Sequence, residues 1–291
     1  MHKEYKVSAI ITTYKRDWDI VMCAIESIKR QTVPVYEIIL VDDNDANSML
    51  SKEIRNFLKK DYPSVKYVSM GMNSGVSAAR NRGILESSGD IIGFLDDDDE
   101  WKKNKLEIML PLFEKEENVG LVFGTGRVVD TFSGREYYNW QWEVFKERPT
   151  YEIMLENDYI GSTSSPLIKK QVLDDVGMFR TKNQPAVEDY ELWIRIAHKY
   201  NIIGTRDVVF LKHTDNMEHV SGSMNRLFQG FKNIYLINKP DYDKNLHASV
   251  GILWNISRVG VRGKNIRVIP YVFKWANAKK REKKCKKQEK S

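Results

Sequence analysis

The sequence of 291 residues has few of the features that mark special classes of protein. It contains two cysteines, Cys23 and Cys285, so neither a disulfide framework nor a thiolate metal site is expected. No apolar run approaches the roughly 18 residues of a membrane-spanning helix, and the N-terminus lacks the apolar length and the cleavage site of a signal peptide. We therefore expect a cytoplasmic protein.

Two common nucleotide-binding motifs are also missing. No Gly-x-Gly-x-x-Gly follows the first apolar run, and no Walker lysine motif occurs anywhere in the chain. A dinucleotide-dependent oxidoreductase and a P-loop enzyme both lose their main support.

The positive charge is confined to one end of the chain. The formal net charge is +6, but residues 274–291 hold nine Lys or Arg and two Glu, which is +7, so residues 1–273 carry 6 − 7 = −1. A nearly neutral body argues against a nucleic-acid partner for the fold itself. The length allows one large domain, or one domain with an appendage.

The first part of the chain alternates between strand and helix patterns. Strands are predicted at Val7–Thr12, Glu37–Val41, Val65–Ser69 and Ile91–Leu95, and helices at Trp18–Arg30, Ser48–Lys60, Val76–Ser87 and Trp101–Glu116. This alternation predicts a mostly parallel α/β sheet with helices on both faces.

The rhythm changes after Asn118. Longer strands are predicted at Val119–Asp130 and Arg135–Glu143, helices at Tyr151–Glu156 and Val187–Tyr200, and a late strand at Val208–Leu211. From about Gly222 the pattern is mostly helical. The last segment, Lys279–Lys290, is charged and of low complexity, which predicts frayed helix or disorder.

Polar residues follow all four of the early strands. The clusters are Thr12 to Arg16, Asp42 to Asn44, Asn73 to Gly75, and Asp96 to Asp99. Ligands of open parallel sheets bind outside the carboxyl ends of the strands, so the clusters are expected to lie on one edge and to form a site there.

Four consecutive carboxylates after a buried strand need an explanation, because adjacent like charges repel. Asp98 and Asp99 could stabilise the first turn of a following helix. That alternative does not account for four acids, whereas Mg²⁺ or Mn²⁺ held by one or two carboxylates and substrate phosphates would. Asp42 and Asp43 could form an Asx-type turn, or accept hydrogen bonds from a base or ribose.

Five stretches together resemble glycosyltransferase family 2, whose members are inverting nucleotide-sugar enzymes with a GT-A fold. They are "VSAIITTYKR", "IILVDDND", "NSGVSAARNRGI", "GDIIGFLDDDDEW" and "VEDYELWIRIA", in the family's order, and the resemblance covers residues 5 to about 213. It implies a Rossmann-like, mostly parallel sheet flanked by helices, with a mostly helical C-terminal extension. We expect a glycosyltransferase domain at 1–220 (nucleotide-binding half 1–117, acceptor-binding half 118–220), a helical extension at 221–278 and a disordered basic tail at 279–291.

The resemblance also implies roles in donor binding. Thr12 and Tyr14 would line the nucleotide site, where Asp43 would bind the base with support from Asp42. Asp96 to Asp98 occupy the family's Asp-x-Asp motif, in which Asp98 would be the principal metal ligand, and Asp96 or Asp97 would contact the ribose or the cation. Arg80 and Asn81 would lie near the donor sugar and phosphate, although Arg80 could instead pair with an acidic neighbour.

The same resemblance implies roles in catalysis and acceptor binding. Asp189 would be the general base that accepts the proton of the acceptor hydroxyl. Glu188, Trp193 and Ser164 would lie near the acceptor, although Trp193 also fits an apolar helical stripe that is typical of a core. A histidine near the metal would be His213 or His219, and His219 fits the family pattern better.

We therefore expect a glycosyltransferase that uses Mn²⁺ or Mg²⁺ to move a sugar, from UDP in particular, to a saccharide or lipid-linked acceptor in the synthesis of bacterial surface polysaccharide or glycolipid. The alternatives are a nucleotidyltransferase that uses the same acidic edge, and a non-catalytic protein that binds nucleotide or membrane. Basic and apolar residues mix within 252–275, which fits either peripheral contact with anionic lipid at the inner face of the plasma membrane or a solvated helical cap.

Overall fold

The structure, a computed structural model, describes residues 4–131, 134–138, 141–214 and 223–288. These residues divide into two compact units. The first contains Met1–Arg148, Ile160–Phe179 and Lys199–Asp215, and the second contains Pro149–Tyr159, Arg180–His198 and Asn216–Ser291. The chain therefore passes between the units several times, and the sequence-based division near residue 220 remains a prediction.

The first unit is built on one mixed sheet of nine strands in the order β3-β2-β1-β4-β8-β6-β9-β5, with β7 paired to β6. The strands are β1 Val7–Thr13, β2 Glu37–Asp42, β3 Val65–Ser69, β4 Ile91–Asp96, β5 Asp99–Trp101, β6 Val119–Asp130, β7 Glu136–Tyr138, β8 Leu167–Lys169 and β9 Asn201–Thr214. Strands β1 to β4 are mutually parallel, as predicted, and β6 pairs parallel to β9. Strand β8 runs antiparallel between β4 and β6.

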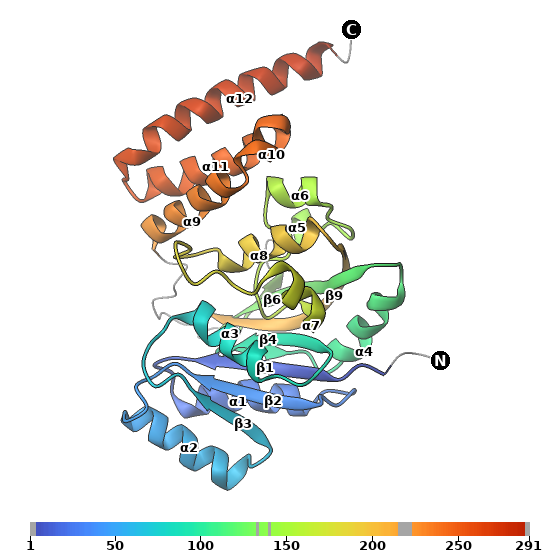
Figure 1. Ribbon diagram of the computed structural model, residues 1–291, viewed down its shortest axis with the longest axis vertical. Coiled ribbons are helices and arrows are strands. Elements are labelled where there is room, and N and C mark those ends of the chain that lie inside the picture. Colours follow the sequence, from blue (N-terminus) through green and yellow to red (C-terminus); the bar gives the residue numbers. More distant parts are fainter. Residues whose placement is uncertain (1–3, 132–133, 139–140, 215–222, 289–291) are drawn as a thin grey trace. The chain divides into compact units, whose positions relative to one another are not determined.

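Helices cover both faces of the parallel strands (Figure 1). The helices of this unit are α1 Trp18–Lys29, α2 Met49–Asp61, α3 Val76–Glu86, α4 Lys105–Met109, the 3₁₀ helix Leu110–Glu114, α5 Gln141–Val144 and α7 Lys170–Val176. Ala9 and Ile11 of β1 pack in one core cluster with the apolar stripe of α1, whereas Ile10 faces α3. Each central strand is thus buried on both faces, which explains its continuous β-branched sequence.

Three predicted elements differ from the structure. The helix predicted at Trp101–Glu116 begins as strand β5, because Asp99 to Trp101 pair antiparallel with Phe210 to Lys212 of β9. Asp98 and Asp99 consequently do not start a helix. The predicted strand Arg135–Glu143 is shortened to β7 and followed by α5, and the predicted strand Val208–Leu211 is the middle of the much longer β9.

The second unit is helical. Its helices are α6 Tyr151–Glu156, α8 Glu188–Ala197, α9 Met224–Ile237, α10 Lys239–Lys244, α11 Leu246–Arg262, the 3₁₀ helix Ile266–Val268 and α12 Ile269–Gln288. Helix α11 packs against α6, α9 and α12, and Gly251 allows the backbone of α11 to approach the carbonyl of Glu156 closely. Residues 279–288, for which frayed helix or disorder was predicted, lie within α12. Among the described residues, no helix combines the length and the apolar character needed to cross a membrane.

A buried lysine holds the loop that precedes β8. Lys105 of α4 has no exposed surface. Its Nζ donates hydrogen bonds to the carbonyl oxygens of Ser164 at 2.6 Å and Ser165 at 2.7 Å, and lies 4.5 Å from the centre of the Trp101 ring. Burial lowers the pKa of Lys105 well below its ordinary value of 10.5, against the opposing influence of the Asp99 charge. The loop is thus fixed by a side chain from a distant part of the sequence.

We predict that Gly83→Ala destabilises the first unit by about 1–2 kcal/mol, because the added methyl would overlap Ile10 Cγ2 and come within 3.3 Å of Val41 Cγ2 in a packed core. Helix propensity alone has the opposite sign, since alanine stabilises a helix by roughly 0.5–1 kcal/mol relative to glycine. Denaturant unfolding measures the difference. Leu85→Ala, on the exposed side of the same helix, is the control and should change stability by no more than about 0.5 kcal/mol. A more stable Gly83→Ala protein would contradict the packing described for α3.

We predict that Lys105→Met destabilises the protein by about 2–4 kcal/mol, because two buried carbonyls lose their donor. Since the pKa of Lys105 is lowered on folding, the unfolded chain binds more protons at this group between the lowered pKa and 10.5. The wild-type protein therefore gains stability from this group as pH rises through that window, and the variant does not. Denaturant unfolding at several pH values measures both effects, with exposed Lys103→Met as the control. A variant that follows the wild-type pH dependence would contradict this role.

Candidate active site

The parallel register places the predicted polar clusters on one edge of the sheet. Thr12 is paired in register with Val41 on one side and with Asp96 on the other, and Thr13 with Asp42. The backbone continues the alignment beyond the strands, since Asp43 N donates to Thr13 O at 2.9 Å. Segments far apart in the sequence therefore end side by side, as the sequence predicted.

Four acids form a continuous turn at this edge, from the last residue of β4 to the first residue of β5. Asp96 is partly exposed, with 27% of its side chain accessible, whereas Asp97 and Asp98 are at 9% and 14%. Asp99 is buried at 1% exposure. Burial of this kind is costly for a carboxylate unless it is paired or protonated, so the partners of the four acids decide their state.

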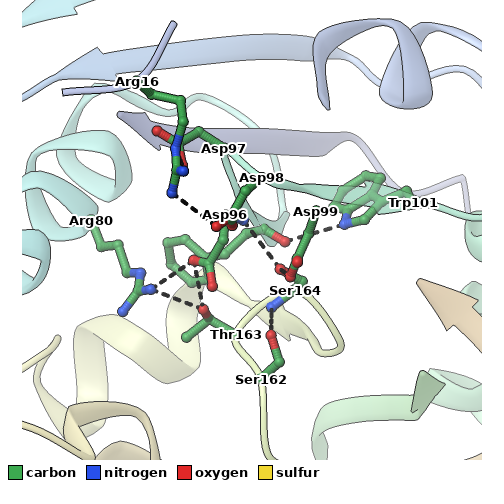
Figure 2. A network of polar contacts seen from close by, with 11 residues as sticks. Arg16, Arg80, Asp96, Asp97, Asp98, Asp99, Trp101, Ser162, Thr163 and Ser164 are labelled. Atoms are coloured by element: carbon green, nitrogen blue, oxygen red, sulfur yellow. Dashed lines mark hydrogen bonds and ion pairs between the residues drawn. The ribbon is translucent and has the colours of Figure 1, made fainter. Parts of the chain in front are cut away.

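One arginine joins two of these acids (Figure 2). Arg16, in the loop after β1, donates from Nε to Asp97 Oδ1 at 3.2 Å and from Nη2 to Asp98 Oδ2 at 2.8 Å. Burial raises the pKa of Asp97 to about 6, although the Arg16 charge opposes the rise. Arg16 belongs to the polar cluster predicted after the first strand, but no role was predicted for it.

A second arginine comes from α3. Arg80, which is 5% exposed, donates from Nη2 to Asp96 Oδ1 at 2.8 Å and to Thr163 Oγ1 at 3.0 Å. Burial alone would raise the pKa of Asp96, but the charges of Arg80 and Lys212 and the hydrogen bonds from Arg80 and Thr163 hold that pKa below its ordinary value. Pairing with an acidic neighbour, the alternative considered for Arg80, is therefore what the structure shows.

Asp99 contacts the loop before β8 and strand β9. Ser164 Oγ donates to Asp99 Oδ2 at 2.6 Å, and Asp96 N donates to the same hydroxyl at 3.1 Å (Figure 2). Lys212 of β9 is the register partner of Asp99. Burial raises the pKa of Asp99 to about 7, against the charge of Lys212. Asp99 and Ser164 thus form a buried support under the more exposed acids.

The acids at the end of β2 accept hydrogen bonds that hold the neighbouring segments in place. Asp42 is fully buried and accepts hydrogen bonds from Ser51 Oγ, from Tyr67 OH at 2.8 Å, and from the backbone and side chain of Asn44 at 2.9 and 2.7 Å. Asn44 Oδ1 in turn accepts the Lys15 N–H at 2.9 Å, in the loop that carries Tyr14. This arrangement matches the Asx-type alternative and is compatible with support of a base site.

Asp43 organises the loop before α3. Its two oxygens accept the backbone N–H groups of Ser74 at 2.7 Å and Gly75 at 2.9 Å. Gly75 has φ +87°, which glycine adopts without strain. Burial raises the pKa of Asp43, and the two backbone donors oppose the rise. The role of Asp43 in base recognition remains a prediction.

Thr12 is half-buried at the end of β1, and Tyr14 is 43% exposed with Lys15 Nζ 5.2 Å from its ring centre. Asn81 exchanges two hydrogen bonds with the backbone of Phe179, from Nδ2 to the carbonyl at 2.8 Å and from Phe179 N to Oδ1 at 2.9 Å. In this structure Asn81 therefore positions that segment, and its place near the donor sugar and phosphate remains a prediction.

Two residues predicted to lie near the acceptor, Ser164 and Trp193, are buried in this structure. Ser164 has no exposed surface, because its hydroxyl is directed to the acidic turn. Trp193 is also fully buried, because the apolar stripe of α8 forms part of the core of the second unit. Both side chains support the structure through these contacts, and their place near the acceptor remains a prediction.

Asp189 and Glu188 belong to the second unit, in the first turn of α8. Both are partly buried, and Asp189 Oδ1 accepts the Tyr190 N–H at 2.8 Å. Val187, just before them, has φ +54°, in the left-handed region that is strained for a β-branched residue. The role of Asp189 as a base remains a prediction.

The structure describes one of the two candidate histidines. His213, on β9, has Nε2 3.0 Å from Glu100 Oε1, and this hydrogen bond raises its pKa. Glu100 directly follows the four acids, so His213 lies next to the turn. His219 lies outside the described residues.

The donor atoms at the turn are suited to a hard cation, because Mg²⁺ and Mn²⁺ take oxygen ligands. Within the described part of the chain, no three His, Cys, Asp or Glu side chains gather into a group that could enclose a metal. Asp96 and Asp98 therefore fit a cation bound by one or two carboxylates, with substrate phosphates and water as the other ligands, and do not form a closed protein cage.

Comparison with known sequences identifies the family. A sequence model for "Glycosyl transferase family 2" matches residues 8–177, more than half of the chain. The chain is 26% identical over 279 residues to the UDP-Glc:alpha-D-GlcNAc-diphosphoundecaprenol beta-1,3-glucosyltransferase WfgD of Escherichia coli, covering 95% of this chain and 99% of that protein. It is 29% identical over 203 residues to the uncharacterized glycosyltransferase YwdF of Bacillus subtilis (strain 168), covering 68% of this chain and 70% of YwdF.

Comparison with solved structures gives the same fold. Residues 1–349 of S. aureus TarS, crystallised in complex with UDP-GlcNAc, superpose with a TM-score of 0.67 at 17% identity, over 94% of this chain and 79% of that one. The chain spans 48% of the longer TarS structure. The mixed, mostly parallel sheet with its helical C-terminal region is therefore a GT-A fold, and the chain belongs to glycosyl transferase family 2 as a glycosyltransferase.

Proposed function

We propose that the protein transfers a sugar from a UDP-sugar to a hydroxyl of a lipid-linked saccharide during the synthesis of bacterial surface polysaccharide, with inversion at the anomeric carbon and with a divalent cation. The name of WfgD describes a UDP-glucose donor and a diphosphoundecaprenol-linked acceptor, and TarS binds UDP-GlcNAc in its crystal. These relatives support the donor class and the acceptor class.

The observation that carries the proposal is the acidic turn at the carboxyl edge of the parallel strands. Asp96 and Asp98 are its more exposed acids, and Arg16 and Arg80 flank them at hydrogen-bond distance. Anionic diphosphate and cationic side chains attract each other, so the two arginines would bind or orient the donor phosphates. A bound Mg²⁺ or Mn²⁺, held by Asp98 and Asp96, would neutralise the charge of the departing diphosphate.

The remaining chemistry is proton transfer from the acceptor. A sugar hydroxyl is a poor nucleophile until its proton is accepted, and a carboxylate within hydrogen-bond reach is a suitable base. We assign this role to Asp189, in the first turn of α8. A single direct displacement at the anomeric carbon, assisted by one base, would invert the configuration of that carbon. The base is therefore needed for transfer and not for donor binding.

The cation is tested by donor turnover. We expect the purified protein to release UDP from a matching UDP-sugar when Mn²⁺ or Mg²⁺ is present, and to lose this activity with EDTA. Asp98→Asn should lower the rate about a hundredfold or more, because a ligand to the charge-neutralising group is lost. The exposed Asp61→Asn in α2 is the matched control and should leave the rate unchanged. Undiminished turnover in EDTA would contradict cation dependence.

The base is tested by separating binding from transfer. Asp189→Asn should bind UDP with wild-type affinity in calorimetry but transfer sugar to an acceptor roughly a hundredfold to ten-thousandfold more slowly. Full transfer activity in this variant would disprove the assignment. Formation of pyrophosphate from a nucleoside triphosphate and a sugar phosphate, with no UDP released from UDP-sugars, would instead support a nucleotidyltransferase.

A further inference from the structure

The connection between α11 and α12 exposes large apolar side chains within the second unit. Ile266 is 79% exposed, Phe273 68%, Val261 60% and Ile269 49%. We call these four residues, with the exposed cations Arg262, Lys264 and Arg267 between them, the corner surface. Single exposed apolar residues are ordinary, but four within thirteen consecutive residues (261–273) mark an interaction surface.

The exposure follows from how α12 packs. Tyr271, Ala278 and Glu282 lie on one side of the helix, where Tyr271 meets the rings of Phe228 and Tyr235, and Glu282 is 2.6 Å from His247 Nδ1. Ile269 and Phe273 have the helical spacing of the opposite side. The core of the second unit is therefore complete without them.

Two tryptophans adjoin this region. The rings of Trp254 on α11 and Trp275 on α12 are 5.1 Å apart, and Trp254 is 48% exposed. Indole rings favour the boundary between lipid headgroups and acyl chains. The aromatic pair therefore suits the same environment as the corner surface.

The charge of this segment has one sign. Residues 244–281 contain nine Lys or Arg and no Asp or Glu. Residues 244–291 together hold fourteen Lys or Arg and two Glu, which is +12, so residues 1–243 carry 6 − 12 = −6. The exposed apolar residues thus lie in the strongly basic part of an otherwise acidic chain.

We propose that the corner surface docks on an anionic lipid bilayer, with Ile266 and Phe273 entering the boundary of the acyl chains and Arg262 and Arg267 binding lipid phosphates. Basic residues beside exposed aliphatic and aromatic side chains are the signature of an interfacial segment. Nucleic acid would use the charge but not the aliphatic groups, and a second copy of the same basic surface would be repelled. This inference does not depend on the transfer reaction.

Vesicle binding tests the proposal with the full chain. Wild-type protein should sediment with vesicles of phosphatidylcholine mixed with phosphatidylglycerol and remain in solution with phosphatidylcholine alone. Ile266→Ser/Phe273→Ser and Arg262→Gln/Arg267→Gln should each weaken binding about tenfold or more, through lost apolar burial and lost charge respectively. Lys52→Gln/Lys59→Gln, which removes two exposed charges of α2, is the matched control and should bind like the wild type.

The variants alter exposed residues, and far-UV circular dichroism checks that they fold. Equal binding to both kinds of vesicle, or none to either, would overturn the proposal. Binding that the arginine variant loses and the serine variant keeps, together with tight binding of DNA, would identify a general polyanion surface. A wild-type dimer that the serine variant converts to monomer, without vesicle binding, would show self-association instead. Because vesicle binding is measured without sugar transfer, its result can be interpreted even if the proposed transfer reaction fails its own test.

Discussion

Charge balance around the acidic turn is the constraint on which the active site depends. Asp96 to Asp99 place four carboxylates at the edge of a buried sheet, and three cationic side chains from separate elements act on them: Arg16, Arg80 and Lys212. Without these partners the turn would repel itself, and burial would favour protonated acids. Because their surroundings differ, the pKa of Asp99 is raised to about 7 while that of Asp96 is lowered.

The neighbouring loops are fixed by the same principle, with neutral donors in place of cations. Asp42 binds four donors, from the loop after β2, from α2 and from β3, and Asp43 binds two backbone N–H groups of the loop before α3. Substituting either acid would disturb several loops at once. These residues therefore have a role in folding, with which the proposed role in nucleotide binding would be combined.

The sequence predicts the strand ends well because their pattern is local. A β-branched run followed by polar residues indicates the end of a strand without information from distant residues. It predicts partners poorly, because Arg16 and Asp98 are 82 residues apart and Lys105 reaches a loop 59 residues away. The helix predicted from Trp101 failed for a related reason. Acids before an apolar run also describe a helix start, and only pairing with β9 makes Asp99–Trp101 a strand. The buried Trp193 shows that a family motif does not reveal accessibility.

Charge also separates two tasks along the chain. Residues 1–243 carry −6 and yet contain the arginines that flank the acidic turn, so the proposed attraction of an anionic diphosphate would be local and would depend on Arg16 and Arg80 at short range. The +12 of residues 244–291 acts instead over a Debye length of about 8 Å at physiological ionic strength, on any extended anionic surface. The membrane that would hold a lipid-linked acceptor is an extended anionic surface of this kind. A nucleotide donor and a membrane-borne acceptor could then be recognised by different parts of the chain without competing for the same cations.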